Sequence, residues 1–401
     1  MPNTSPHLNR PEHNRLSLQG RTNSVTSIII TKNRPQKVKR LVKSLIAAEL
    51  DSISIVLIDD SDADNFLQTK SFFQSHSLPF IQLSSLQAGK LVGEILNEAN
   101  LTESDKNFIR NCTGINSPFC GYVERFLELV KEPKPTPTGR YLQFAPYSAA
   151  RNLGICCAVK FFKPESIFFL DDDCVILHPT KMKSQIQLIG AKLNRKNIVA
   201  VAGLYRDISD YSHFEQRIFE KFLRILRGMD VFLRKCFAVG KERFVIMPLH
   251  ILGGVLLLDK RAFYVLPFDP YVARGEDHAY ALDLKAFLDK NEIAIRDNHF
   301  IVGHQKEEVP SPKHMEMNVL RDIFRFVYIH RKARRSFISF FVFRWLLASL
   351  VSLLFNPPNY KQYTNELWAL MFVAPHYTKK NAYAFKQGVS AWNDFLRQLG
   401  T

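Results

Sequence analysis

The sequence predicts an α/β fold built on a mostly parallel sheet with helices on both faces. Two continuous apolar runs, VTSIIIT (25–31) and ISIVLI (53–58), are separated by an amphipathic stretch that ends near Leu50. A strand, a helix and a second fully apolar strand in this order are typical of a parallel sheet that is covered on both sides. A chain of 401 residues is long enough for one large domain and an appendage.

The remaining elements follow from the same patterns. A helix and a short strand are expected after residue 58, ending near Leu83. The pattern loosens from 84 to 147 and closes on a Pro-rich stretch, so we expect an insertion that carries local helix. Ser148 is suited to cap a helix that leads into the apolar strand 166–170. Three more strands are expected at 199–204, 250–258 and 294–303, with a helix from Glu276 to about Lys290 before the last.

Both ends of the chain differ in composition from this central part. Residues 1–24 are rich in Asn, Pro, Ser, Arg and His and contain no apolar segment of a secretory signal. We therefore expect a tail with little order and a cytoplasmic protein. The six cysteines show no repeated metal-ligand spacing, which favours reduced thiols. The main domain is placed at 25–305, and the basic, helical residues 306–401 form the appendage.

Three carboxylates stand together where a predicted strand ends. Asp171, Asp172 and Asp173 directly follow the apolar residues 166–170. Neighbouring carboxylates repel one another unless a cation lies between them, and Mg²⁺ or Mn²⁺ with oxygen ligands usually binds phosphate as well. This cluster therefore indicates chemistry on a phosphate-bearing substrate. The alternative is an acidic turn without a ligand.

Other polar residues fall at the same edge of the predicted sheet. Asp59 and Asp60 follow one strand, the turn from Thr31 to Arg34 follows another, and Arg151 lies at a helix start. In open α/β sheets ligands bind at the carboxyl ends of the strands, and a helix start with an arginine suits phosphate. A nucleotide could thus contact several of these loops at once.

Six segments together resemble the GT-A fold nucleotide-sugar glycosyltransferases, closest to the family 2 type. In chain order they are SIIITKNRP (27–35), SIVLIDDSD (54–62), SAARNLG (148–154), IFFLDDDCVI (167–176), LGGVLLLDKRAF (252–263) and FDPYVARGEDHAYALDL (268–284). The resemblance implies a Rossmann-like GT-A domain and a divalent metal, Mg²⁺ or Mn²⁺. The long segment 84–147 departs from the family pattern.

The resemblance also implies roles for individual residues. Asp171 and Asp173 would hold the metal and diphosphate, with His304 as a third ligand or else as a structural histidine. The donor would contact Thr31, Asn33, Arg34, Asp59, Asp60, Arg151, Asn152 and Asp172. For Arg151 and Asn152 the alternative is a helix end that ties the sheet together.

A second acidic pair, Glu276 and Asp277, matches the catalytic pair of the resembling family. Transfer to a hydroxyl needs a base for its proton, and the resemblance gives this role to Asp277 in inverting enzymes. The alternative is stabilisation of a helix start by acidic residues. Gly253 and Gly254 match the acceptor-side loop, although glycines there could equally mark a bulge.

Charge and hydropathy suggest an anionic partner. The formal net charge is +16, which favours nucleotide diphosphates or an anionic membrane surface, while no basic–aromatic pattern for nucleic acid is present. The segment FISFFVFRWLLASLVSLLF (337–355) has the length of a membrane span but carries Arg344 near its middle. An interfacial helix, a buried helix and a span stay open as alternatives, and the first implies a peripheral protein at the cytoplasmic face of a membrane.

These features predict transfer of a sugar from a nucleotide diphosphate to a hydroxyl of a glycan or lipid-linked acceptor. Two alternatives are a sugar nucleotidyltransferase and an inactive nucleotide-sugar-binding subunit. The first would need a Gly-rich phosphate loop after the first strand, and TKNRP (31–35) has no glycine. Retention of both acidic pairs opposes the second. The sequence does not distinguish retaining from inverting transfer.

Overall fold

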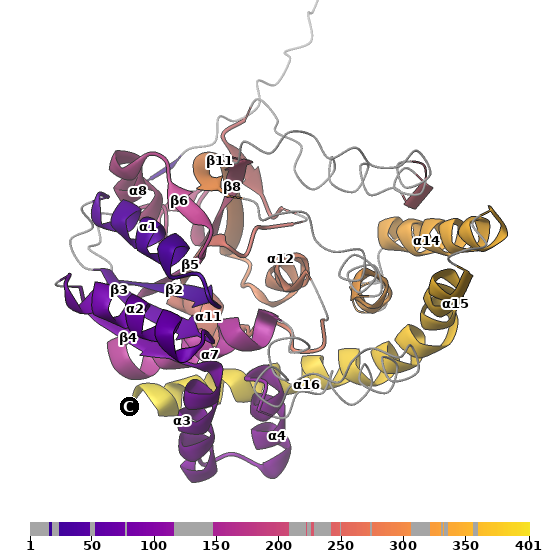
Figure 1. The fold of residues 1–401 in the computed structure, drawn as a ribbon, viewed down its shortest axis with the longest axis horizontal. Helices are drawn as coiled ribbons and strands as arrows, with labels where there is room; N and C mark the ends of the chain where they lie inside the picture. Colours follow the sequence, from indigo (N-terminus) through magenta and orange to yellow (C-terminus); the bar gives the residue numbers. More distant parts are fainter. Residues whose placement is uncertain are drawn as a thin grey trace, which may run out of the picture.

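The computed structural model describes residues 16–17, 24–48, 53–76, 78–115, 147–207, 222, 226–227, 242–248, 250–272, 275–305, 321–329, 332, 336–355 and 360–401. Their centre is an 11-stranded sheet with helices on both faces (Figure 1). The predicted α/β class is confirmed. The helical character predicted for the C-terminal region is confirmed as well.

A parallel core of four strands matches the apolar runs of the sequence. In spatial order it consists of β5 (Ser166–Asp171), β2 (Val25–Thr31), β3 (Ile53–Asp59) and β4 (Phe80–Leu83). Every residue of β2 is buried except Ile30, which is partly buried, because helices cover both faces. The carboxyl ends of these strands therefore lie along one edge.

The rest of the sheet is mixed. Strand β10 (Val255–Asp259) runs antiparallel between β5 and β8 (Lys196–Asp207). Strand β11 (Glu292–His304) lies parallel to β8 and antiparallel to β6 (Cys174–Ile176) and β9 (Phe244–Ile246). The register pairs His304 with Cys174, so the end of β11 lies beside the residues that follow β5.

A short strand lies within the tail for which little order was predicted. Leu16 and Ser17 form β1 (Leu16–Ser17), which pairs antiparallel with β7 (Lys192–Leu193) at the sheet edge. Other residues of the tail up to 23 lie outside the described part of the chain.

One face of the sheet is covered by α1 (Pro35–Ile46), α2 (Ala63–Gln74) and α8 (Pro179–Ile186) (Figure 1). Helix α1 begins at a proline, which fits a first helical position because the amide hydrogen is not needed there. Val38, Leu41, Val42 and Leu45 recur at helical spacing and are buried. The helix therefore packs one apolar stripe against the sheet.

The opposite face carries α7 (Tyr147–Phe162), α11 (Lys260–Val265), α3 (Ser85–Glu98) and α4 (Glu103–Cys112). Helices α3 and α4 fall in the predicted insertion 84–147, yet their apolar residues belong to the same core as α7. A capping box of Ser84 and Gln87 starts α3. The Pro-rich end of the insertion lies outside the described residues.

The C-terminal region returns to this face. It comprises α14 (Ser336–Phe355), α15 (Tyr360–Trp368), the π-helical turn η2 (Ala369–Val373) and α16 (Ala374–Gly400), which runs back across the main domain in contact with α4, α11 and α7 (Figure 1). Trp392 of α16 is fully buried and donates a hydrogen bond to the Phe263 carbonyl at 2.8 Å. Among the described residues, no helix combines the length and hydropathy that crossing a bilayer requires.

Buried charges also join the C-terminal region to the main domain. Lys332 donates to Asp269 and, at 2.7 Å, to Asp283, and the Tyr328 hydroxyl donates to Asp269 at 2.9 Å. One lysine thus forms ion pairs with two buried carboxylates. Burial, together with the negative charge of Asp269, raises the pKa of Asp283 to about 6.

Candidate active site

The polar residues singled out from the sequence surround the carboxyl ends of β2, β3 and β5. The end of β11, the start of α7 and the start of α12 (Glu276–Phe287) complete the cluster. Strand ends of a parallel sheet meet at one edge, which explains why residues distant in sequence come together here.

Asp172 is held by Thr31, the last residue of β2, and by Arg34 from the turn that follows. The Thr31 hydroxyl donates to Oδ2 at 2.7 Å, and the Arg34 guanidinium donates to Oδ1 at 3.0 Å. Burial raises the pKa of Asp172, and Arg34 opposes this change. The three predicted donor-site residues therefore form one fixed unit, in which Arg34 keeps about a third of its side chain exposed (34%).

Arg151 connects the two acidic pairs. Its guanidinium donates to Asp171 Oδ1 at 3.2 Å, to Glu276 Oε1 at 3.3 Å and to the Gly253 carbonyl at 2.6 Å. The nearby carboxylates raise the pKa of Arg151 against the effect of its burial. A buried cation shared in this way fixes the end of β5 relative to the start of α12.

Asp173 and His304 lie next to each other at the rim. His304 Nε2 is 3.5 Å from Asp173 Oδ2, and the Gln305 amide donates to the Asp173 carbonyl at 3.0 Å. The other carboxylate oxygen, Oδ1, is buried and has no hydrogen-bond partner in the described part of the structure. Burial and the Asp171 charge raise the pKa of Asp173 to about 6.

These two side chains fit a metal that arrives with a phosphate substrate. Within the described residues, no three His, Cys, Asp or Glu side chains are arranged to hold an ion. Mg²⁺ is commonly bound by one or two carboxylates while substrate phosphates and water supply the other ligands. The unpartnered oxygen of Asp173 and the adjacent imidazole of His304 match that partial set, whereas both oxygens of Asp171 already accept hydrogen bonds.

Asp277 lies beside Gly253, whose carbonyl accepts a hydrogen bond from Arg151. Its Oδ1 accepts from the His278 amide at 2.7 Å and lies 3.7 Å from His250 Nε2, and its Oδ2 is 3.4 Å from the Gly253 amide. The side chain is 20% exposed, whereas that of Glu276 is 8% exposed. Of the two acids, Asp277 is therefore the one that solvent or a ligand can reach.

Gly253 and Gly254 allow close approach within the cluster. A Cβ on Gly253 would lie 2.8 Å from the Arg151 guanidinium. A Cβ on Gly254 would overlap both the Asp171 carboxylate and the Tyr205 hydroxyl. Both glycines therefore provide space for Arg151 and Asp171, in addition to any contact they make with an acceptor.

Asp59, Asp60 and Asn33 fix the neighbouring turns. Asp59 is fully buried and accepts from Gln82 Nε2 at 2.7 Å. Asp60 accepts from the Ser85 amide at 2.8 Å and its hydroxyl at 2.6 Å, at the start of α3. Asn33, with φ of 56°, accepts from the Asp62 amide at 2.8 Å. Asp60, which is partly exposed, stays accessible beside the β2 turn.

Asn152 is fully buried beneath the cluster. Its amide nitrogen donates to the carbonyls of Cys112 and Phe268, and its oxygen accepts from the Phe268 amide, at 2.8 to 2.9 Å. All these partners are backbone groups. This arrangement favours the alternative in which Asn152 ties elements together.

Two residues of the cluster were missed from the sequence. Tyr205, at the end of β8, donates to Asp171 Oδ2 at 2.8 Å, and its ring stacks on His304 with centroids 4.6 Å apart. His250 lies beside Asp277, and burial lowers its pKa. Tyr205 directly follows the strand predicted at 199–204, so the strand-end argument could have identified it.

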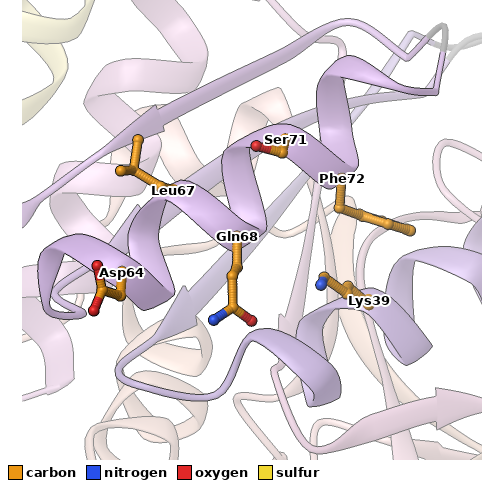
Figure 2. A pocket seen from close by; sticks show the side chains of 6 residues that line it. All are labelled: Lys39, Asp64, Leu67, Gln68, Ser71 and Phe72. Atoms are coloured by element: carbon orange, nitrogen blue, oxygen red, sulfur yellow. The ribbon is translucent and has the colours of Figure 1, made fainter.

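A separate hollow of about 700 Å³ lies away from this cluster, between α1 and α2 (Figure 2). Lys39 of α1 and Asp64, Leu67, Gln68, Ser71 and Phe72 of α2 line it. It contains no residue of the acidic cluster. Asp64 is exposed there.

No protein-family model matches the chain, and a search of curated proteins finds no match. Among solved structures it is similar to the mannosyltransferase PcManGT from Pyrobaculum calidifontis in complex with GDP-Man and Mn²⁺, at 12% identity over 96% of this chain and 91% of that chain (TM-score 0.45). It is also similar to mannosyl-3-phosphoglycerate synthase from Rubrobacter xylanophilus, at 10% identity over 78% and 76% (TM-score 0.41). A third is S. aureus TarS 1–349 in complex with UDP, at 11% over 93% and 90% (TM-score 0.42).

Proposed function

We propose that the protein is a divalent-metal-dependent glycosyltransferase that moves a sugar from a nucleotide diphosphate to a hydroxyl of a glycan or lipid-linked acceptor. The observation that carries this proposal is the shared arginine: Arg151 bonds both Asp171 and Glu276. It thereby links the carboxylates beside Asp173 to the carboxylate beside Asp277. A diphosphate site and a base within one cluster are what sugar transfer to a hydroxyl requires.

On the donor side, Asp173 and His304 would hold the metal together with the diphosphate oxygens. When bound, the metal would supply positive charge to the departing diphosphate. Asp172, fixed by Thr31 and Arg34, would orient the ribose or the sugar. Arg34 is partly exposed, so its guanidinium has room to contact a donor as well.

On the acceptor side, Asp277 would take the proton of the attacking hydroxyl. Its two oxygens face the His278 and Gly253 amides and the His250 imidazole, which keep the carboxylate in one orientation. Glu276 is paired with Arg151 and is less exposed, so it would position the cluster rather than accept the proton. A base on the acceptor side implies inversion at the anomeric carbon.

The test is a donor screen that measures nucleotide diphosphate release with Mg²⁺, with Mn²⁺ and with a chelator. Asp173→Asn and Asp277→Asn should each lower release by at least about a hundredfold, since charge stabilisation and general base catalysis contribute factors of this order. Asp64→Asn, at the exposed position on α2, is the matched control and should leave release unchanged.

The products distinguish the competing functions. Pyrophosphate in place of nucleotide diphosphate would indicate a sugar nucleotidyltransferase. Donor binding without release for any donor and acceptor would indicate an inactive binding subunit. Normal release by both Asp173→Asn and Asp277→Asn would show that the residue roles are wrong.

A further inference from the structure

Helix α14 buries small residues together with Trp345 against the protein and exposes several large apolar residues to solvent. Ala348, Ser349 and Ser352 are 0% exposed, whereas Phe343 is 63% and Leu354 72% exposed. A helix surrounded by water normally buries Phe and Leu and exposes Ser. The arrangement in α14 is the reverse, and it is typical of helices whose outer face meets lipid, since small residues then line the contact between helices.

Specific contacts fix the rotation of α14. Trp345 is 3% exposed and lies against the Phe326 ring, with centroids 5.8 Å apart. The Ser349 hydroxyl donates to Glu366 Oε2 of α15 at 2.8 Å. The Ser352 hydroxyl donates to the Ala348 carbonyl at 2.7 Å. These contacts fix the inward face against the protein, although Trp345 Nε1 has no hydrogen-bond partner in the described part of the structure, and they hold the opposite face outward.

The outward face is a continuous apolar stripe. Phe343, Leu347, Leu350 and Leu354 follow one another at intervals of four, three and four residues, which places them on one side of a helix. Their exposed fractions are 63%, 40%, 44% and 72%. Single exposed leucines are ordinary on soluble proteins, but a stripe on every turn indicates a binding surface.

The charge around this stripe identifies what it binds. From Arg331 to Phe355 the sequence contains five Lys or Arg residues, namely Arg331, Lys332, Arg334, Arg335 and Arg344, and no Asp or Glu. Lys332 is neutralised by its pairs with Asp269 and Asp283, so the excess positive charge comes from the four arginines. The only acid in α15 and η2 is Glu366, which is fully buried and paired with Arg227 at 2.8 Å. The described surface of these elements therefore carries no exposed carboxylate.

We propose that the stripe of Phe343, Leu347, Leu350 and Leu354 inserts into the interface of an anionic lipid bilayer, to which the positive charge of this part of the sequence attracts it. Apolar burial combined with attraction to anionic lipid is how interfacial helices bind. A second copy of this chain is a poorer partner, because it would bring the same positive charges and no exposed acid on these elements. None of these residues belongs to the acidic cluster, so the membrane contact stands apart from the proposed sugar transfer.

The experiment is co-sedimentation of the full-length protein with vesicles. Vesicles of phosphatidylglycerol and phosphatidylcholine are compared with phosphatidylcholine alone. The triple variant Leu347→Gln, Leu350→Gln, Leu354→Gln should bind the anionic vesicles about a hundredfold more weakly, because three leucines no longer bury apolar surface in the bilayer. Leu86→Gln on α3 is the matched control, because Leu86 is 73% exposed and Leu354 72%.

The single variant Leu354→Gln, which leaves the inward face of α14 intact, should weaken binding about fivefold. Salt should weaken wild-type binding too, because the attraction to headgroups is screened. Binding of the triple variant equal to wild type would overturn the proposal. Equal wild-type binding to both vesicle types would overturn it as well. Light scattering that shows a dimer in wild type and a monomer in Leu354→Gln would assign the stripe to a second copy instead.

Discussion

Replacing Gly254 by alanine should disable the candidate site while the rest of the fold survives. A Cβ at this position would come within 3.0 Å of the Asp171 carboxylate and the Tyr205 hydroxyl, closer than real Cβ contacts. The carboxylate must therefore shift. Asp171 is bonded to Arg151 and Tyr205 is stacked on His304, so a shift of either side chain disturbs these contacts.

The size of the effect follows from this overlap. Overpacking of this kind costs about 1 to 3 kcal/mol of unfolding free energy. A displacement of about 1 Å at a catalytic group costs on the order of a hundredfold in rate. We expect Gly254→Ala to lose about 1 to 3 kcal/mol of unfolding free energy in a urea titration. We also expect it to release nucleotide diphosphate about a hundredfold more slowly.

The control is Gly89→Ala in helix α3. A Cβ there would be 3.6 Å from Ile115, which is ordinary contact, so alanine should raise the unfolding free energy by about 0.5 to 1 kcal/mol and leave turnover unchanged. If Gly254→Ala keeps both the stability and the turnover of wild type, Asp171 is not held where the close approach of Gly254 places it, and the account of the cluster is wrong.

Three further substitutions test the network. Arg151→Met should destabilise the protein by about 3 to 5 kcal/mol in urea unfolding, because it removes the ion-pair partner of the buried Glu276 carboxylate; a loss below about 1 kcal/mol would contradict this. Tyr205→Phe keeps the ring but removes the bond to Asp171, so it should cost about 1.5 to 3 kcal/mol in the same assay, and an unchanged urea midpoint would argue against that bond. Asp283→Asn should gain stability relative to wild type as pH rises. The folded-state pKa of Asp283 is raised to about 6 from 3.8, so wild type loses up to about 3 kcal/mol between pH 4 and pH 7 as this carboxyl ionises in the native state; a stability difference that stays flat with pH would refute the assignment.

The sequence predicted the parallel core well because its signal is local. Residues 25–31 and 53–58 are apolar throughout, and a strand covered on both faces has no other composition available. The rule that ligands bind at strand ends then predicted that Asp60, Asp172 and Asp173 lie along one edge of the sheet. Strand β10 shows the limit of this reasoning, since Leu256, Leu257 and Leu258 are as apolar as a parallel strand but lie antiparallel to β5.

The partners of the site residues could not be predicted in the same way. Arg151 was expected to face a diphosphate, but its bonds to Asp171 and Glu276 depend on tertiary distances that spacing does not encode. Tyr205 follows a predicted strand, but its bond to Asp171 and its stacking on His304 likewise depend on tertiary distances. The segment 84–147 was expected to be an insertion, yet its first two helices pack into the main core, because their apolar residues match the face of α7.

Calorimetric titration of the candidate site with nucleoside diphosphates tests the central claim most directly. UDP, GDP, ADP, CDP and TDP are titrated into wild type and into Asp173→Asn, each with Mn²⁺ and with a chelator. The account predicts that at least one of them binds wild type at least about tenfold more tightly with Mn²⁺, and that Asp173→Asn abolishes this difference. Binding that is indifferent to Mn²⁺ in wild type, or a metal effect that persists in Asp173→Asn, would contradict it.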